Sequence, residues 1–336
     1  MSVPAPTGGV DDHPPHLEPS QLGTKEYWES FYNNSLSHLS SKRGAERKRQ
    51  ARNRDENEAN DRDDEEEGDD DDYDSDEDED DDDDPGTSWF TEHNAPEKVM
   101  RFLTSESFPL APCNTQAQSQ SQPQPQPQPN ILDLGTGNGS MLALLRDEGG
   151  FTGGQMVGVD YSPKSIELAR RLHDSPARGD GATTPAIRFE VWDVFDKSAV
   201  QELDWFPAAQ GGFDIVLDKG TFDAISLSAE EIAAGKRGGE EDVDMKGSRV
   251  VQQRVCERYP GIVRGLVRKD GFLVVTSCNW TEEELIRWFT RRVEEEGGEE
   301  GDRLVVWDRV EYPKFRFGGQ EGQGVCTVCF RRVSGS

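Results

Sequence analysis

The 336-residue sequence has no long hydrophobic run and only five cysteines. No apolar stretch approaches the roughly 20 residues of a membrane-spanning helix, so we expect no membrane span. The first 20 residues show no basic segment followed by an apolar stretch, so we expect no secretory signal. An odd number of widely spaced cysteines fits a reducing compartment. We therefore expect a cytoplasmic protein, with the nucleus as an alternative location.

Metal-binding motifs are also scarce in the sequence. Cys326 and Cys329 are spaced as C-x-x-C, but they lie in "GVCTVCFRRV", which predicts a strand. Residues three apart on a strand point to opposite faces of the sheet. No second Cys or His pair lies nearby in the sequence. We therefore expect two buried thiols and no metal site.

The net charge of −30 comes mostly from one tract. Residues 55–84 contain 23 acidic residues and one Arg, whereas residues 42–54 contain seven basic residues and one Glu. Blocks of like charge bury too little apolar surface to fold. We expect a disordered insertion over residues 40–84, and we expect the folded part to be monomeric and to bind no nucleic acid.

Low-complexity segments divide the rest of the chain. We expect a disordered N-terminus at 1–19 and a segment at 20–39 that packs on the main domain. The main domain spans 85–333 and carries insertions at 112–129, which is rich in Gln and Pro, and at 233–248, which is Gly-rich and charged.

Strand and helix patterns alternate after residue 130. "NILDLG", "QMVGVDYS", "AIRFEVWDVF", "FDIVLDK" and "GFLVVTSC" predict strands, and "VVQQRVCERYPGIVRGLV" predicts a helix that is interrupted or bent near Pro260. The last two strands have no helix between them. The pattern predicts an α/β fold with a doubly wound, seven-stranded sheet, mostly parallel, that ends in an antiparallel C-terminal β-hairpin.

Three glycines at alternate positions mark the first strand-to-helix junction. Gly135, Gly137 and Gly139 lie in "DLGTGNG", where glycine allows a tight turn and close approach of a ligand. The loop lacks the lysine of a P-loop and the spacing of a dinucleotide fingerprint. The preceding Asp133 would repel a pyrophosphate and suits a ligand with a positive group.

Four successive predicted strands end in an acidic residue: Asp133, Asp160, Asp193 and Asp218. Asp160 is placed to accept hydrogen bonds from ribose hydroxyls, and Asp193, beside Trp192, could accept one from an adenine amine. Asp133 suits an amino-acid ammonium. This set matches an adenosyl amino acid better than a dinucleotide.

These motifs resemble the seven-stranded class I methyltransferases. "LGTKEYWESFYNNSL", "WF" at 89–90, "LDKGTFDAI" and "YPKFRFGGQEGQGVCTVCF" further resemble the elongation factor methyltransferase 4 and methyltransferase-like protein 10 family of protein-lysine methyltransferases. The resemblance implies S-adenosylmethionine as cofactor and translation elongation factor 1-alpha as protein substrate. The residues expected to bind the cofactor are Asp133, Gly135, Thr136, Gly137, Gly139, Asp160, Tyr161, Trp192, Asp193 and Val194.

Methylation of a lysine needs the neutral amine, so catalysis is mostly positioning. We assign orientation of the amine to Asp218 with the backbone of Lys219, Gly220 and Thr221. Alternatively, Asp218 pairs with Lys219 or caps the turn that follows. Aromatic residues that could form a lid and a lysine channel, or alternatively pack in the core, are Tyr27, Trp28, Trp89, Phe90 and Phe222.

Other functions stay open on the sequence alone. One is methylation of a small-molecule amine. Another is an interaction protein whose acidic tract is the working part and whose fold is a scaffold. An NAD oxidoreductase fits less well, because the glycine spacing differs and no His lies at a strand end.

Overall fold

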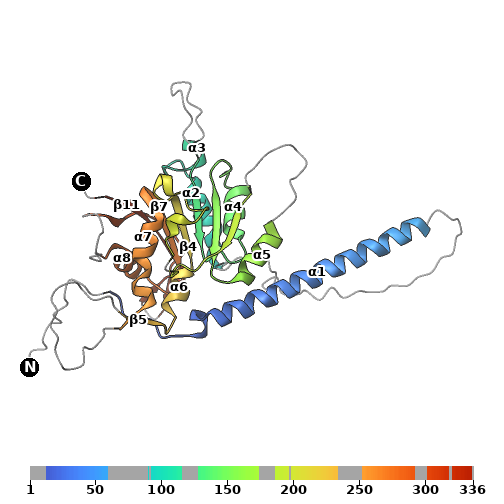
Figure 1. Cartoon of the computed structure of the whole chain (residues 1–336), viewed down its shortest axis with the longest axis horizontal. Coiled ribbons are helices and arrows are strands. Elements are labelled where there is room, and N and C mark those ends of the chain that lie inside the picture. The colour runs from blue at the N-terminus through green and yellow to red at the C-terminus, as the bar shows by residue number, and fades with distance from the viewer. Residues whose placement is uncertain are drawn as a thin grey trace, which may run out of the picture.

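A seven-stranded sheet forms the centre of the protein in the computed structural model (Figure 1). The structure describes residues 13–59, 90, 92–115, 128–173, 186–196, 198–233, 252–291, 301–317 and 320–334. Within these ranges, no helix is long and apolar enough to cross a membrane.

The strands of the sheet follow the order β3-β2-β1-β4-β7-β11-β8. Their bounds are β1 Ile131–Leu134, β2 Met156–Asp160, β3 Arg188–Val191, β4 Phe213–Lys219, β7 Val267–Ser277, β8 Arg303–Val310 and β11 Cys326–Val333. The first five are parallel, and β11 is antiparallel to both β7 and β8. The predicted fold class is confirmed. Strand order reverses between β1 and β4, and ligands bind at the carboxyl ends of strands at such a switch point.

Helices cover both faces of this sheet. Their bounds are α2 Ala95–Thr104, α4 Ser140–Asp147, α5 Pro163–His173, α6 Thr221–Ser226, α7 Tyr259–Leu266 and α8 Glu282–Thr290. Alternate residues of β1 separate the two cores: Ile131 packs with α2, α4 and α5, whereas Leu132 and Leu134 pack with α6, α7 and α8. This is the alternation expected of a strand buried on both faces.

The two cysteines of β11 confirm this alternation. Cys326 belongs to the core on the α7 and α8 side, and Cys329 belongs to the opposite core. Both are buried free thiols, as the sequence predicted.

Shorter elements connect the main ones. They are η1 Gln21–Gly23, η3 Glu92–Asn94, α3 Pro112–Thr115, η4 Val200–Glu202, η5 Ala208–Gln210, η6 Val255–Glu257 and two strand pairs, β5 Glu231–Ala233 with β6 Gln252–Arg254 and β9 Phe315–Phe317 with β10 Gln320–Gly322.

The helix predicted over residues 250–267 is wrong in its first half. Residues 252–254 form β6, and α7 begins only at Tyr259. Pro260 lies in the first turn of α7, where a residue without an N–H costs nothing, so it begins the helix and does not bend it.

The long N-terminal helix α1, Lys25–Ala59, packs against α5 (Figure 1). Tyr32, Leu36 and Leu39 of α1 are buried with Leu168 of α5. Residues 40–59 are helical, so the disorder expected for this part of 40–84 is wrong. The segment is rich in Ala, Arg, Lys and Glu, which favour a helix by their intrinsic propensity. Residues 60–84 lie outside the described ranges, as do residues 116–127 of the insertion expected at 112–129 and residues 234–248 of the one expected at 233–248. Residues 112–115 form α3, and Ala233 ends β5, so these ends belong to the folded domain.

We predict that replacing residues 45–84 with a Gly/Ser linker leaves the free energy of unfolding within about 0.5 kcal/mol of the wild type. The last buried side chain described on α1 is Leu39, and residues 40–44 are exposed. In contrast, Leu36→Ala should cost about 2–5 kcal/mol, because it empties the contact with α5. Urea denaturation measures both; equal losses would contradict the assignment of stability to residues 25–44.

Candidate active site

A cavity of about 760 Å³ opens at the carboxyl ends of β1, β2 and β4. The glycine loop after β1, the residues after β2 and β3, and α6 form its floor and sides, and α1 forms a wall. The predicted cofactor and substrate residues on its lining are Trp28, Phe90, Gly135, Thr136, Gly137, Asp160, Tyr161, Trp192, Asp193, Val194, Lys219, Gly220 and Thr221.

The glycine loop fits only a bare backbone. Gly135 and Gly137 have φ values of 58° and 59°. A Cβ on Gly135 would lie 2.2 Å from Thr221 Oγ1, and one on Gly137 would lie 2.9 Å from the Tyr32 hydroxyl. The loop therefore brings backbone to the cavity surface, as a ligand cradle requires.

Gly139 has a different place. It is the N-cap residue of α4, with φ of 78°, and it does not line the cavity. A Cβ there would lie 2.6 Å from Phe189 Cζ, so this glycine allows α4 and β3 to pack closely. Its predicted part in cofactor binding is thus indirect.

Asp160, at the end of β2, joins the glycine loop to the start of α5. Its Oδ1 accepts from the Ser162 amide at 2.9 Å, and its Oδ2 accepts from the Gly137 amide at 3.2 Å and from Ser165 Oγ at 2.8 Å. Burial raises the pKa of Asp160 to about 6. The carboxylate still lines the cavity, so it can meet a ligand hydroxyl while it holds the loop.

Asp133 lies beneath the loop and does not line the cavity. Its Oδ2 accepts from Thr136 Oγ1 at 2.7 Å, and burial raises its pKa to about 6 although Lys219 opposes this shift. The prediction that Asp133 faces a ligand ammonium is therefore not supported by its position. Asp133 instead contacts two residues that do line the cavity: it accepts a hydrogen bond from the Thr136 side chain, and it interacts with the charge of Lys219.

The residues after β3 form one side of the cavity. Trp192 is buried and packs edge-on against Trp205, whereas Asp193 is exposed. Asp193 Oδ1 accepts from the Phe195 amide at 2.9 Å, and Asp193 is one of the residues that line the cavity. Apolar contact beside one carboxylate acceptor suits an aromatic base with an exocyclic amine.

Asp218 does not line the cavity, which corrects the main catalytic assignment. Its Oδ1 accepts from the amides of Thr221 and Phe222 at 2.9 and 3.1 Å, and its Oδ2 accepts from the Tyr259 hydroxyl at 2.7 Å. The side chain is buried, and burial raises its pKa to about 7. Asp218 therefore caps α6, the alternative that the sequence left open.

Asp223, in the first turn of α6, is a carboxylate at the carboxyl-end edge of the sheet that was not assigned to the site from the sequence. It is buried, lines the cavity and accepts from Ser277 Oγ and from the Cys278 amide at 2.5 and 2.9 Å. Burial raises its pKa. Asp223 lies in the first turn of the helix that borders the cavity, but its position in the sequence alone does not distinguish it from Asp218.

The predicted aromatic lid is only partly assembled. Trp28 lines the cavity from α1 together with Phe31 and Tyr32, which the sequence analysis did not single out. Their spacing of three and four residues is the signal for one helix face. Tyr27 does not line the cavity but packs edge-on against Trp28, at 5.3 Å between ring centroids.

Phe90 covers the loop after β4. A Cβ on Gly220 would lie 2.5 Å from Phe90 Cε2, and the Lys219 Nζ lies 5.7 Å from the centroid of the Phe90 ring. Trp89 lies outside the described residues. Phe222 is fully buried and stacks on Tyr259 at 5.6 Å, so its assignment to a lid is wrong: it points from α6 into the core.

Comparisons with known proteins agree with this geometry. Residues 126–317 match the family described as "Methyltransferase domain". Protein-lysine N-methyltransferase EFM4 of Saccharomyces cerevisiae is 33% identical over 245 residues, which are 73% of this chain and 82% of that protein. This chain belongs to the EFM4 family of protein-lysine N-methyltransferases.

Two further relatives cover nearly the whole enzyme. Protein-lysine N-methyltransferase efm4 of Schizosaccharomyces pombe is 27% identical over 94% of this chain and 95% of its own length. EEF1A lysine methyltransferase 2 of Danio rerio is 27% identical over 99% of this chain and 100% of its own length.

The cofactor is S-adenosylmethionine, and the cavity fits it. The glycine loop is a cradle that a Cβ would fill, and the carboxylates of Asp160 and Asp193 are acceptors for hydroxyl and amine groups. The cavity lacks the Gly-Lys-Ser/Thr sequence of a phosphate loop. This donor set suits a ligand that has hydroxyls, an amine and a positive charge and has no phosphate.

We predict that Asp160→Ala and Asp193→Ala each weaken S-adenosylmethionine binding by about 1–3 kcal/mol, the cost of an unpaired hydrogen-bonding group. Asp160→Ala should also lower the melting temperature, because the Gly137 amide loses its acceptor. Asp193 is exposed, so Asp193→Ala should leave the melting temperature unchanged. Isothermal titration calorimetry and thermal unfolding separate the two; unchanged affinity in both variants would remove these carboxylates from the site.

We also predict a pH effect at Asp218. The unfolded chain loses this proton near pH 4, whereas the folded protein holds it up to about pH 7, so the contribution of Asp218 to stability falls as the pH rises between these values. Asp218→Asn keeps an acceptor for the Thr221 and Phe222 amides and removes the titration.

From pH 4 to pH 7 the wild type should lose up to about 4 kcal/mol of stability relative to Asp218→Asn. Urea denaturation of both proteins across this range measures the difference. Other buried carboxyls are present in both proteins and cancel. Parallel stability curves would show that Asp218 is ionised throughout.

Proposed function

We propose that this enzyme methylates a lysine of translation elongation factor 1-alpha with S-adenosylmethionine as the methyl donor. The relatives named EEF1A lysine methyltransferase 2 and EFM4 support this substrate, and they align with most or all of the chain. The observation that carries the proposal is the cavity itself, which combines the glycine cradle with an aromatic wall on α1 and a buried carboxylate on α6. We further propose that the enzyme acts in the cytoplasm, in keeping with its five free thiols.

The reaction needs the substrate lysine as a neutral amine in line with the methyl group. When bound, S-adenosylmethionine supplies an electrophilic methyl group on a positively charged sulfur. The chain supplies an apolar wall from Trp28, Phe31 and Phe90, which excludes water from the incoming lysine. Loss of water disfavours the ammonium form and lowers the pKa of that lysine.

Asp223 is the residue that we assign to orient the amine. Ser277 and Cys278 hold its carboxylate from the end of β7, so its position is fixed before substrate arrives. A carboxylate that accepts a hydrogen bond from the amine sets the direction of the nitrogen lone pair. Its effect is therefore one of positioning, which is the main contribution available to this reaction.

A direct assay tests the substrate. The enzyme is incubated with recombinant elongation factor 1-alpha and isotope-labelled S-adenosylmethionine, and the labelled peptide is located by mass spectrometry. Label on one lysine of the factor supports the proposal. Label only on small amines in the same mixture would instead support the alternative of a small-molecule methyltransferase.

We predict that Asp223→Asn lowers the methylation rate by roughly 10²-fold, the scale for a misplaced reactant. Asp218→Asn is the matched control: it changes a buried carboxylate five residues away that does not line the cavity, so it should keep nearly full activity. Calorimetry should show similar cofactor affinity in both variants. Loss of activity in Asp218→Asn with full activity in Asp223→Asn would return the role to Asp218.

A further inference from the structure

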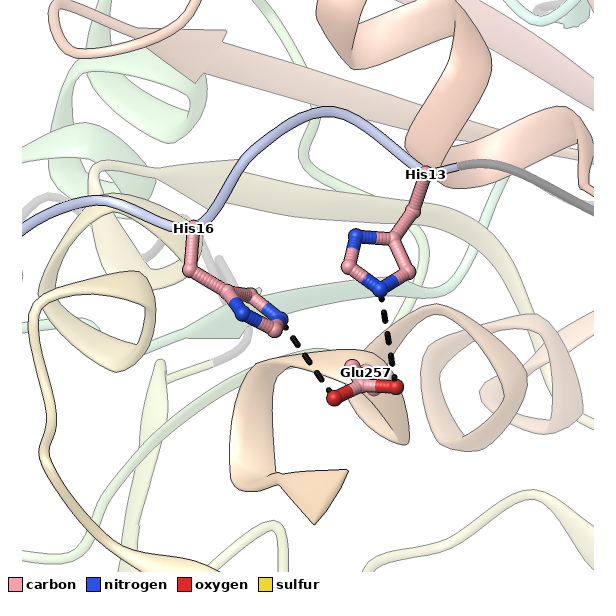
Figure 2. A group of neighbouring side chains, drawn as sticks. All are labelled: His13, His16 and Glu257. Atoms are coloured by element: carbon pink, nitrogen blue, oxygen red, sulfur yellow. Dashed lines mark ion pairs between the residues drawn. The ribbon is translucent and has the colours of Figure 1, made fainter. Parts of the chain in front are cut away.

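Three side chains outside the cavity converge on one point (Figure 2). His13 and His16 lie in the segment before η1, and Glu257 lies in η6. His16 Nε2 is 3.3 Å from Glu257 Oε1, and His13 Nε2 is 3.8 Å from Glu257 Oε2. One ligand atom from each residue lies within 4.8 Å of the others.

A hydrogen bond to the backbone fixes the tautomer of His13, whose Nε2 faces Glu257. Its Nδ1 lies 2.7 Å from the Pro14 carbonyl, which requires the hydrogen on Nδ1. In the neutral ring, Nε2 then presents a lone pair to the carboxylate. His16 Nε2 is buried and lies at ion-pair distance from Glu257 Oε1, without a well-directed hydrogen bond among the described residues. The lone pair of His13 Nε2 and the carboxylate of Glu257 repel each other unless a proton or a metal cation lies between them.

Protonation of both histidines would be the other source of positive charge. The two rings lie with centroids 4.6 Å apart, so two imidazolium ions would repel each other while sharing one carboxylate. A neutral imidazole is the form that binds a metal.

We propose that His13, His16 and Glu257 bind a zinc-type divalent cation, with water in the fourth position. Two imidazole nitrogens and one carboxylate oxygen are a ligand set that zinc accepts. The surroundings have the outer contacts of such a site. The Pro14 carbonyl fixes the His13 tautomer, the Arg254 amide donates to Glu257 Oε1 at 3.0 Å, and the Trp288 ring stacks on His13 at 4.8 Å.

The cation would fasten the N-terminal segment to η6, beside α6. The Arg254 guanidinium already bridges the N-terminal segment and α6, because it donates to the carbonyls of Leu17 and Ser226 at 2.6 and 3.0 Å. Leu22 and Gly23, a few residues further on, line the cavity. The site thus holds the start of the chain where it leads into α1, and its role is structural.

Zinc binding to the full-length protein, with any affinity tag removed, tests this proposal. Equilibrium dialysis against Zn²⁺ in excess Mg²⁺ should give one more bound zinc per chain in the wild type than in His16→Ala or Glu257→Gln. The affinity at this site should fall by more than the roughly 10- to 100-fold that loss of an outer-shell partner costs. His38→Ala is the matched control, because His38 is exposed on α1 and lies outside the cluster.

Two further measurements keep the outcome clear. Co²⁺ should give the visible absorption of a four-coordinate site in the wild type and His38→Ala, and this signal should be lost in His16→Ala. Zn²⁺ should raise the melting temperature of the same two proteins and leave that of His16→Ala unchanged, while all three unfold cooperatively without metal. Equal zinc content in wild type and His16→Ala, or none in the wild type, would overturn the proposal.

Discussion

The buried carboxylate of Asp218 holds together the two loops on which the cavity depends. By accepting from the Thr221 and Phe222 amides it starts α6 directly at the end of β4. Thr221 is thereby placed to donate from Oγ1 to the Leu134 carbonyl at 2.6 Å, and Leu134 is the last residue before the glycine loop. This side-chain hydrogen bond ties the start of α6 to the end of β1, in the space that Gly135 leaves by having no side chain.

This arrangement divides the acidic residues at the strand ends into two kinds. Asp133 and Asp218 are turned inward, where each satisfies the polar groups of the loop that follows it. Asp160 and Asp193 satisfy such groups and also reach the cavity. Burial raises the pKa of Asp133, Asp160 and Asp218. These costly buried carboxyls lie where donors of the turns need acceptors: the Thr136 hydroxyl for Asp133, and backbone amides for Asp160 and Asp218.

The sequence was sufficient where one local pattern decides the structure. The glycine loop and the acidic ends of β2 and β3 follow from spacing alone, because parallel strands bring their carboxyl ends to one edge. The sequence could not tell Asp218 from Asp223. Both follow β4 closely, and the difference is whether the side chain turns back to cap α6 or projects from its first turn. That depends on Tyr259, a partner far along the chain.

Charge composition obscured the length of α1, and distance along the chain hid the histidine pair. Charge composition indicated disorder after residue 40, but helix propensity continues α1 to Ala59. His13 and His16 are three residues apart in a proline-rich segment, and only the fold brings Glu257 to them. Long-range partners of this kind leave no periodic signal in a single sequence.

The inserted segments of this chain connect to different edges of the sheet, one at the amino ends of the strands and the others near their carboxyl ends. The Gln- and Pro-rich segment lies between α3 and β1, and Figure 1 places α3 at the end of the sheet opposite α6. An insertion there enters at the amino end of a strand, away from the cavity. The acidic tract and the Gly-rich charged loop are bordered by different parts of the fold. Phe90, which follows the acidic tract, lines the cavity, and the β5–β6 pair, which flanks the Gly-rich loop, begins next to Glu230 on the cavity lining. The described residues that border these two segments at Phe90 and at the β5–β6 pair therefore lie at or beside the cavity, whereas α3 and the start of β1, which border the Gln- and Pro-rich segment, do not line it.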